Sequence, residues 1–265
     1  MILTQLLVRK FIIGLPFYDL VSVTEEWRFY LLIFSTVLIA AAGYIINDYF
    51  DIKIDLINKP KKVYVGRIIK RRYALLTHQF LSGFAIALGF FLGLKILFVK
   101  IVAVVLLWFY ASIFKKKAFL GNLIVSFLTA LAIFEIDLLY NQNSKLLYIY
   151  AVFAFFINLI REIIKDIEDI RGDKMHGAIT LPIKIGIRKT KLVIYGLFTI
   201  LASLVLKLSI GIGNPKLWFV FSILGFLVSI FIYKLIFSDR KKHFQELSKL
   251  CKFIMILGIL SMIVL

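Results

Sequence analysis

Long apolar segments dominate this chain and limit what it can fold into. A membrane-spanning helix needs about 20 largely apolar residues. Eight stretches approach that length, at residues 28–46, 74–94, 96–114, 119–139, 147–163, 190–208, 217–237 and 250–265. A ninth, residues 2–17, is weaker because Arg9 and Lys10 interrupt it. The chain is 62% hydrophobic, whereas soluble domains are roughly half apolar. We therefore predict an all-α membrane protein with about nine transmembrane helices.

The positive charge follows the membrane topology. The net charge of +18 could indicate a nucleic-acid partner, but the lysines and arginines gather in every second connection. These basic segments are residues 48–73, 115–117, 161–191 and 238–252. The alternate connections, 18–27 and 140–146, hold one lysine between them. Basic loops of membrane proteins remain in the cytoplasm. We expect an integral protein of the inner cell membrane with cytoplasmic basic loops, and no nucleic-acid partner.

The cysteine and histidine content argues against a disulfide and against a zinc site. Cys251 is the only cysteine, which excludes an internal disulfide, and the three histidines match no zinc spacing. No linker or low-complexity segment is visible, so residues 1–265 are expected to form one domain. The first apolar stretch is short and no cleavable signal peptide precedes it. The N-terminus is therefore expected to be incomplete.

Two acidic clusters follow apolar segments. In a helix, Asn47, Asp51 and Asp55 would lie on one face, with Asp48 beside it. A second cluster, at spacings of 4, 3 and 4, would also share one face, and it consists of Glu162, Asp166, Asp169 and Asp173. Both clusters are predicted on the same side of the membrane.

Carboxylates near a membrane are costly, so they need water, basic partners or cations. They could simply be solvated loop charges neutralised by nearby lysine and arginine. Oxygen ligands without histidine or cysteine instead select hard ions such as Mg²⁺, which often binds one or two carboxylates together with a substrate phosphate. Two facing acidic clusters therefore favour a diphosphate held between magnesium ions.

Three segments resemble a known family. NDYFDIKID, residues 47–55, resembles the N-D-x-x-D-x-x-x-D motif of the UbiA-type intramembrane prenyltransferases, and INKP follows it as in that family. KDIEDIRGDKMHGAITLPIKIG, residues 165–186, resembles the second aspartate signature. FYASIFKKKAFLGN, residues 109–122, resembles the segment between the two. The three occur in the family's order and span most of the chain.

The resemblance implies a helical bundle around a central cavity, with a Mg²⁺-dependent active site at its cytoplasmic side. It implies magnesium ligands at two places: Asn47, Asp48, Asp51 and Asp55 in the first motif, and Asp166, Asp169 and Asp173 in the second. It also implies that Tyr110 and Lys115 contact the diphosphate or the allylic cation. The further catalytic residues that it implies are Asp51, Asp166 and Asp169. Gly172 and Gly177 would allow tight turns, and Tyr44 is a further aromatic candidate. No obligate protein partner is implied.

One departure concerns the basic residues after the first motif. Family members commonly have an arginine there, within Arg-Pro-x-x-x-Gly, whereas this chain reads KKVYVGR. Lys61, Lys62 or Arg67 would have to replace it, and a lysine lacks the bidentate fork of arginine. The other predicted substrate contacts are Asn47, Arg161 and Lys165, the last two pairing with nearby acid or holding an acceptor phosphate.

Several reactions remain open. The second motif is most similar to the branch that transfers a geranylgeranyl group to geranylgeranylglyceryl phosphate, with Asp166 or Glu162 as candidate base. Branches that prenylate aromatic, quinone-precursor acceptors share the core motifs. A CDP-alcohol phosphatidyltransferase is disfavoured because no D-G-x-x-A-R occurs. A cation-coupled transporter is the alternative from another class, although its ionisable residues would be expected near mid-membrane on broken helices.

Overall fold

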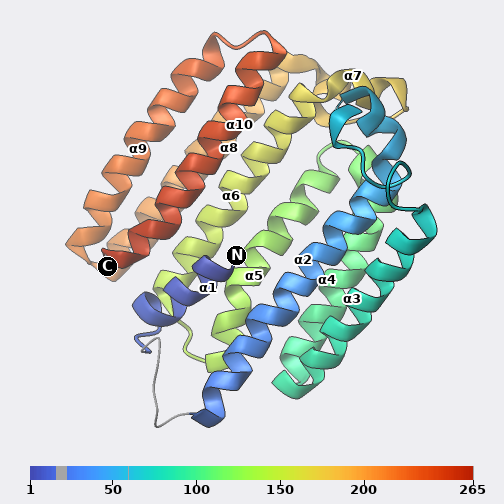
Figure 1. Cartoon of the computed structure of the whole chain (residues 1–265). Helices are drawn as coiled ribbons and strands as arrows, with labels where there is room; N and C mark the ends of the chain where they lie inside the picture. Colours follow the sequence, from blue (N-terminus) through green and yellow to red (C-terminus); the bar gives the residue numbers. More distant parts are fainter. Residues whose placement is uncertain (16–22, 59, 265) are drawn as a thin grey trace.

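The protein is described by a computed structural model that covers residues 1–15, 23–58 and 60–264, without the side chains of residues 23–26 and Lys62. The described residues contain eight long α-helices (Figure 1). These are α2 (Val23–Asn58), α3 (Arg71–Leu92), α4 (Leu94–Ser112), α5 (Leu120–Tyr140), α6 (Lys145–Glu168), α8 (Leu181–Ile212), α9 (Pro215–Ile236) and α10 (Lys241–Leu260). The short elements are α1 (Ile2–Leu7), the π-helical turn η1 (Val8–Ile12), α7 (Ile170–Met175) and three 3-10 turns, η2 (Pro60–Lys62), η3 (Phe114–Lys116) and η4 (Ser261–Ile263).

The predicted all-α membrane class is confirmed, but the count of nine spans is not. Within the described residues, seven helices are long and apolar enough to cross a membrane. The described part of the stretch 2–17, residues 2–15, forms only the short α1 and η1, which together end at Ile12 and fall well below the about 20 residues of a span. The last predicted span begins inside α10, whose first turns carry charges, including Lys241, Lys242 and Glu246.

The helices run side by side, and α6 lies among them (Figure 1). Of its apolar window, 61% is buried, against 22% for α9. Isoleucines of α6 belong to the largest core cluster of the described residues, together with residues of α8, α9 and α10. The outer helices instead expose large apolar side chains, such as Phe80, Leu94 and Phe226. An apolar outer surface of this extent is expected where the surrounding solvent is lipid.

One end of the bundle is polar and carries the longer connections. The segments after α2, α4 and α6 contain η2, η3 and α7 in turn, and α9 connects to α10 at the same end (Figure 1). The connections at the other end that the structure describes in full are short: Gly93, residues 141–144, and residues 213–214. We call the end with the longer, polar connections the acidic end, because the aspartates of α2, α6 and α7 lie there.

Candidate active site

The first acidic cluster lies on one helix, as predicted. Because α2 continues unbroken to Asn58, Asn47, Asp51 and Asp55 fall on successive turns of one face. The Asn47 Nδ2 group donates a hydrogen bond to Asp51 Oδ2 at 2.8 Å. Asp51 is only 4% exposed. A buried carboxylate needs compensating donors, and the turn η3, which follows α4, provides a cationic one.

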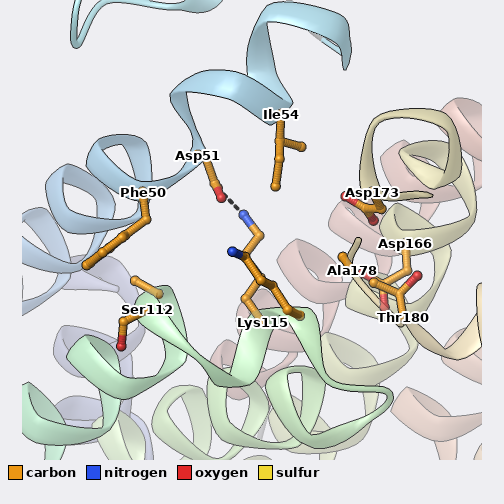
Figure 2. A pocket seen from close by; sticks show the side chains of 11 residues that line it. Phe50, Asp51, Ile54, Ser112, Lys115, Asp166, Asp173, Ala178 and Thr180 are labelled. Carbon is orange, nitrogen blue, oxygen red and sulfur yellow. Dashed lines mark hydrogen bonds and ion pairs between the residues drawn. The ribbon is translucent and has the colours of Figure 1, made fainter. Parts of the chain in front are cut away.

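Lys115, in η3, reaches into this cluster. Its Nζ group donates to Asn47 Oδ1 at 3.1 Å and forms an ion pair with the Asp51 carboxylate (Figure 2). Burial by itself would lower the pKa of Lys115, but the Asp51 carboxylate outweighs burial and raises this pKa above the ordinary value of lysine. The Lys115 side chain therefore carries a positive charge at the mouth of the site.

Two backbone features hold η3 in place. A Cβ atom on Gly121 would lie 2.9 Å from the Phe114 carbonyl oxygen, so the start of α5 can approach η3 only with glycine there. On the other side, the Ile179 amide donates to the Lys116 carbonyl at 2.8 Å. This bond ties the segment after α7 to the turn that carries Lys115.

The second acidic cluster is not one continuous helix, and this part of the prediction is wrong. Asp169 leaves the helical conformation, with φ −97° and ψ 6°, and it separates α6 from α7. Glu162 and Asp166 stay on α6, whereas Asp173 belongs to α7. Asn122 of α5 orients Asp166 by donating to its Oδ2 at 2.9 Å. The break turns α7 toward α2, which a continuous α6 would not do.

Asn58 joins the two clusters. Its Nδ2 group donates to the Asp169 carbonyl oxygen at 3.2 Å, and its Oδ1 atom accepts from the Gly172 amide at 3.2 Å. A Cβ atom on Gly172 would lie 2.5 Å from Asn58 Nδ2, so this contact requires glycine. The last residue of α2 is thereby fixed against the α6–α7 break.

The two clusters share one cavity of about 560 Å³ between α2, α4, α5 and α6. Its lining includes every predicted metal ligand: Asn47, Asp48, Asp51, Asp55, Asp166, Asp169 and Asp173. A smaller hollow of about 40 Å³ lies where Asp51 and Lys115 face Asp166 and Asp173 (Figure 2). Within the described part of the chain, no three carboxylate, histidine or cysteine side chains are gathered into a ready-made metal site. The donors are all hard oxygen atoms, which suit Mg²⁺ that also binds a phosphate.

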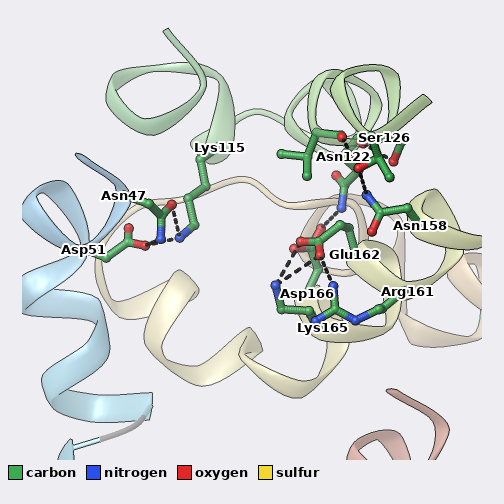
Figure 3. A network of polar contacts seen from close by, with 12 residues as sticks. Asn47, Asp51, Lys115, Asn122, Ser126, Asn158, Arg161, Glu162, Lys165 and Asp166 are labelled. Atoms are coloured by element: carbon green, nitrogen blue, oxygen red, sulfur yellow. Dashed lines mark hydrogen bonds and ion pairs between the residues drawn. The ribbon is translucent and has the colours of Figure 1, made fainter. Parts of the chain in front are cut away.

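Glu162 is the centre of a second polar group on α6. Arg161 Nη1 lies 2.8 Å from Glu162 Oε1, and Lys165 Nζ lies 3.0 Å from Glu162 Oε2 (Figure 3). All three residues line the cavity. The predicted pairing of Arg161 and Lys165 with nearby acid is confirmed. Two cations against one carboxylate leave a net positive charge beside the acidic cluster.

Of the three basic residues expected to act after the first motif, the two whose side chains are described are not brought into the site. Lys61 and Arg67 are exposed, and neither is among the described residues that line the cavity. The Arg67 guanidinium donates to the Pro60 carbonyl at 3.0 Å instead. The Lys62 side chain lies outside the described residues. From this connection, Tyr64 lines the cavity, and so do the predicted Tyr44 and Tyr110.

Three functional candidates at the opposite end of the cavity were not predicted from the sequence. Thr36, Lys100 and Glu135 line it there and contact one another. Lys100 and Glu135 interrupt predicted apolar spans, which was a signal for an intramembrane polar site. The bridging role of Asn58 also escaped prediction, because it depends on the tertiary contact with Gly172.

Comparison with known proteins now places the chain. Residues 14–257 match the model of the UbiA prenyltransferase family. The chain belongs to the UbiA prenyltransferase family. This UbiA-family chain is 35% identical over 231 residues to digeranylgeranylglyceryl phosphate synthase of Methanosphaera stadtmanae, covering 83% of this chain and 81% of that one. It is 33% identical over 240 residues to the synthase of the same name from Korarchaeum cryptofilum, covering 85% and 81%.

Solved structures give the same family fold. A structure described as digeranylgeranylglyceryl phosphate synthase matches with a TM-score of 0.76 and 26% identity, covering 99% of this chain and 90% of that one. A UbiA homolog from Archaeoglobus fulgidus bound to GPP and Mg²⁺ matches with a TM-score of 0.70 and 14% identity, covering 98% and 95%. At 14% identity, the similarity to the Archaeoglobus fulgidus homolog shows a shared fold only. The family membership makes this chain a membrane prenyltransferase and removes the case for the transporter.

Proposed function

We propose that this protein transfers a geranylgeranyl group from geranylgeranyl diphosphate to geranylgeranylglyceryl phosphate, in a Mg²⁺-dependent step of ether-lipid synthesis. The observation that carries the proposal is the meeting of both aspartate clusters and Lys115 around one cavity, which continues between the helices as an apolar shaft. This shape suits a substrate with an anionic head and a long apolar tail. The synthase names of the relatives support the same acceptor.

The aspartates of the two clusters would hold the metal. Asp51 and Asp55, with Asn47 and Asp48, would ligate one ion from α2, and Asp169 and Asp173 would ligate another. Bound Mg²⁺ would neutralise the diphosphate and stabilise the negative charge that develops on it. Lys115, which pairs with Asp51, would add a positive charge to the diphosphate oxygens when the substrate binds.

The transfer can be written from these groups. The bond between the allylic carbon and the diphosphate oxygen breaks, and its electron pair leaves on the diphosphate. The acceptor hydroxyl oxygen forms the new carbon–oxygen bond and loses its proton. We assign the proton to Asp166, which accepts a hydrogen bond from Asn122, because Glu162 is already neutralised by Arg161 and Lys165.

The acceptor phosphate has a candidate partner in the same cavity. Arg161 and Lys165 carry two positive charges against the single charge of Glu162, so the group retains attraction for an anion. The planar guanidinium of Arg161 suits bidentate phosphate binding. An uncharged aromatic acceptor would not use this pair, so the two cations favour the phosphate acceptor over a neutral quinone precursor.

We propose that the acidic end of the protein faces the cytoplasm. The connections at that end hold the lysine and arginine clusters, including residues 67–72, 115–117 and 240–242. The described connections at the other end, Gly93, residues 141–144 and residues 213–214, hold neither residue type. This asymmetry is the one that the positive-inside rule describes.

The test is an acceptor screen with the full chain in lipid vesicles. Labelled geranylgeranyl diphosphate is supplied with Mg²⁺ and either geranylgeranylglyceryl phosphate or an aromatic acceptor. We expect a labelled diether phosphate only with the first acceptor, and no product when EDTA removes the metal. Transfer only to the aromatic acceptor would overturn the acceptor assignment. Unchanged transfer in EDTA would overturn the metal assignment.

A further inference from the structure

A buried ion pair lies deep among the helices, away from the acidic end. Lys100 Nζ of α4 lies 2.7 Å from Glu135 Oε2 of α5. The Lys100 side chain is fully buried, and that of Glu135 is 4% exposed. Thr36 of α2 completes the group, since its hydroxyl accepts from Lys100 at 2.6 Å and lies 2.9 Å from Glu135 Oε2. We call these three residues the polar floor.

The polar floor closes the cavity on three helices at once. Among the described lining residues, Thr36 is the one farthest from the acidic end on α2, Lys100 on α4 and Glu135 on α5. The cavity therefore has the aspartates at one end and a charged pair at the other. Desolvated charges are costly to disturb, so an alkyl chain gains nothing by displacing this pair.

The wall between the two ends is mostly apolar and contains small residues, and its polar side chains Asn158 of α6 and Thr129 of α5 are hydrogen-bonded to each other at 3.2 Å. On α2 it is formed by Ile39, Ala40 and Gly43, and on α4 by Ala103 and Leu107. The α5 wall consists of Val125, Leu128, Leu131 and Ala132, with Thr129 as its polar exception. A shaft of this composition suits a hydrocarbon chain.

The depth of the shaft corresponds to a defined chain length. Fifteen residues separate Asp51 from Thr36 on α2, which at about 1.5 Å per residue is roughly 22 Å. An extended chain of four isoprene units has a similar length of roughly 20 Å, because each carbon–carbon bond of about 1.5 Å advances a zigzag by less than its own length. A fifth unit would press its methyl groups against the ion pair.

We infer that the polar floor of Thr36, Lys100 and Glu135 is a specificity element that limits the prenyl donor to four isoprene units. The inference rests on the proposed function, since it assigns the donor tail to this shaft. The floor residues touch only the far end of the tail, so they act on donor selection and not on the bond that breaks. A purely structural ion pair between α4 and α5 would leave donor selection unchanged.

The first test removes the floor. The double variant Lys100→Ala/Glu135→Ala leaves no unpaired buried charge, and Thr36 keeps its contact with the Leu32 carbonyl at 2.6 Å. We expect its kcat/KM for geranylfarnesyl diphosphate, relative to geranylgeranyl diphosphate, to rise about tenfold, the scale on which apolar pockets distinguish chain lengths. Thermal melting of the purified chain reports whether the double variant is folded.

A second variant shortens the shaft above the polar floor and leaves the ion pair intact. Ala103 lies one helical turn from Lys100 toward the acidic end, so Ala103→Leu should shorten the shaft. We expect the preference to move toward farnesyl diphosphate by about tenfold. The matched control is Val105→Leu, on the exposed face of the same helix, with an unchanged donor profile.

The outcomes separate the two proposals. If the wild-type chain transfers no prenyl group to any acceptor, the proposed function is wrong, and so is the role of the polar floor in donor selection. If the wild-type chain transfers geranylgeranyl groups while Ala103→Leu and the folded double variant both keep its donor profile, only the floor is wrong. A shift toward longer donors in the double variant and toward shorter donors in Ala103→Leu confirms it.

Discussion

Asn58 and Gly172 hold the two acidic clusters together, because the amide side chain at the end of α2 fits against a backbone position that has room for glycine alone. Gly172→Ala would place a Cβ atom 2.5 Å from Asn58 Nδ2 and displace the Asn58 side chain from its hydrogen bonds to Asp169 and Gly172. We expect transfer to fall about 100-fold, since a displacement near 1 Å is enough for a loss of that size.

Gly196→Ala is the matched control for this prediction. A Cβ atom at Gly196, in the interior of α8, would have no neighbour within 4 Å. Transfer rates of both variants in vesicles, with melting temperatures, provide the measurement. A Gly172→Ala variant as active as Gly196→Ala would show that the Asn58 contact does not position the site.

Lys115 should act on the departing diphosphate. Lys115→Ala removes the charge that pairs with Asp51 and that would meet the diphosphate, so we expect kcat to fall by about 10²–10³. Lys117→Ala, two residues away on the exposed surface, should leave the rate unchanged. Single-turnover release of labelled diphosphate measures the effect. Equal rates for both variants would remove Lys115 from the mechanism.

Asp51 and Asp169 should each be needed to hold the metal. Asp51→Ala and Asp169→Ala are both expected to reduce turnover by at least about 100-fold, because each leaves an ion under-ligated. Excess Mg²⁺ should restore part of the activity in titrations from micromolar to millimolar metal. Asp239→Ala, whose side chain is 86% exposed, is the control. Wild-type rates in both site variants would contradict the diphosphate assignment.

Arg161 should affect the acceptor and spare the donor. Arg161→Gln removes one of the two cations beside Glu162 and keeps a polar side chain. We expect KM for geranylgeranylglyceryl phosphate to rise about tenfold, because the loss of one charge-assisted hydrogen bond weakens binding by about 1.5 kcal/mol. KM for the donor should stay within twofold, about 0.4 kcal/mol. An equal rise in both constants would mean that Arg161 shapes the cavity as a whole.

The sequence was most informative where local geometry decides the structure. The spacing of Asn47, Asp51 and Asp55 predicted one helical face, and α2 confirms it because nothing interrupts the helix before Asn58. The break at Asp169 was not predictable from spacing, since it accompanies the Asn58 contact formed more than 100 residues away in the chain. The same limit applies to Lys100 and Glu135, whose charges are visible in the sequence but whose pairing depends on how α4 meets α5.

The meeting of the two aspartate clusters around a single diphosphate is tested most directly by a double-mutant cycle. Diphosphate release from geranylgeranyl diphosphate is measured for Asp51→Ala, Asp169→Ala and the double variant under identical Mg²⁺. If both residues act on the same anion, the losses are strongly non-additive, and the double variant is about as slow as the slower single variant. Losses that multiply as independent effects would contradict a shared site.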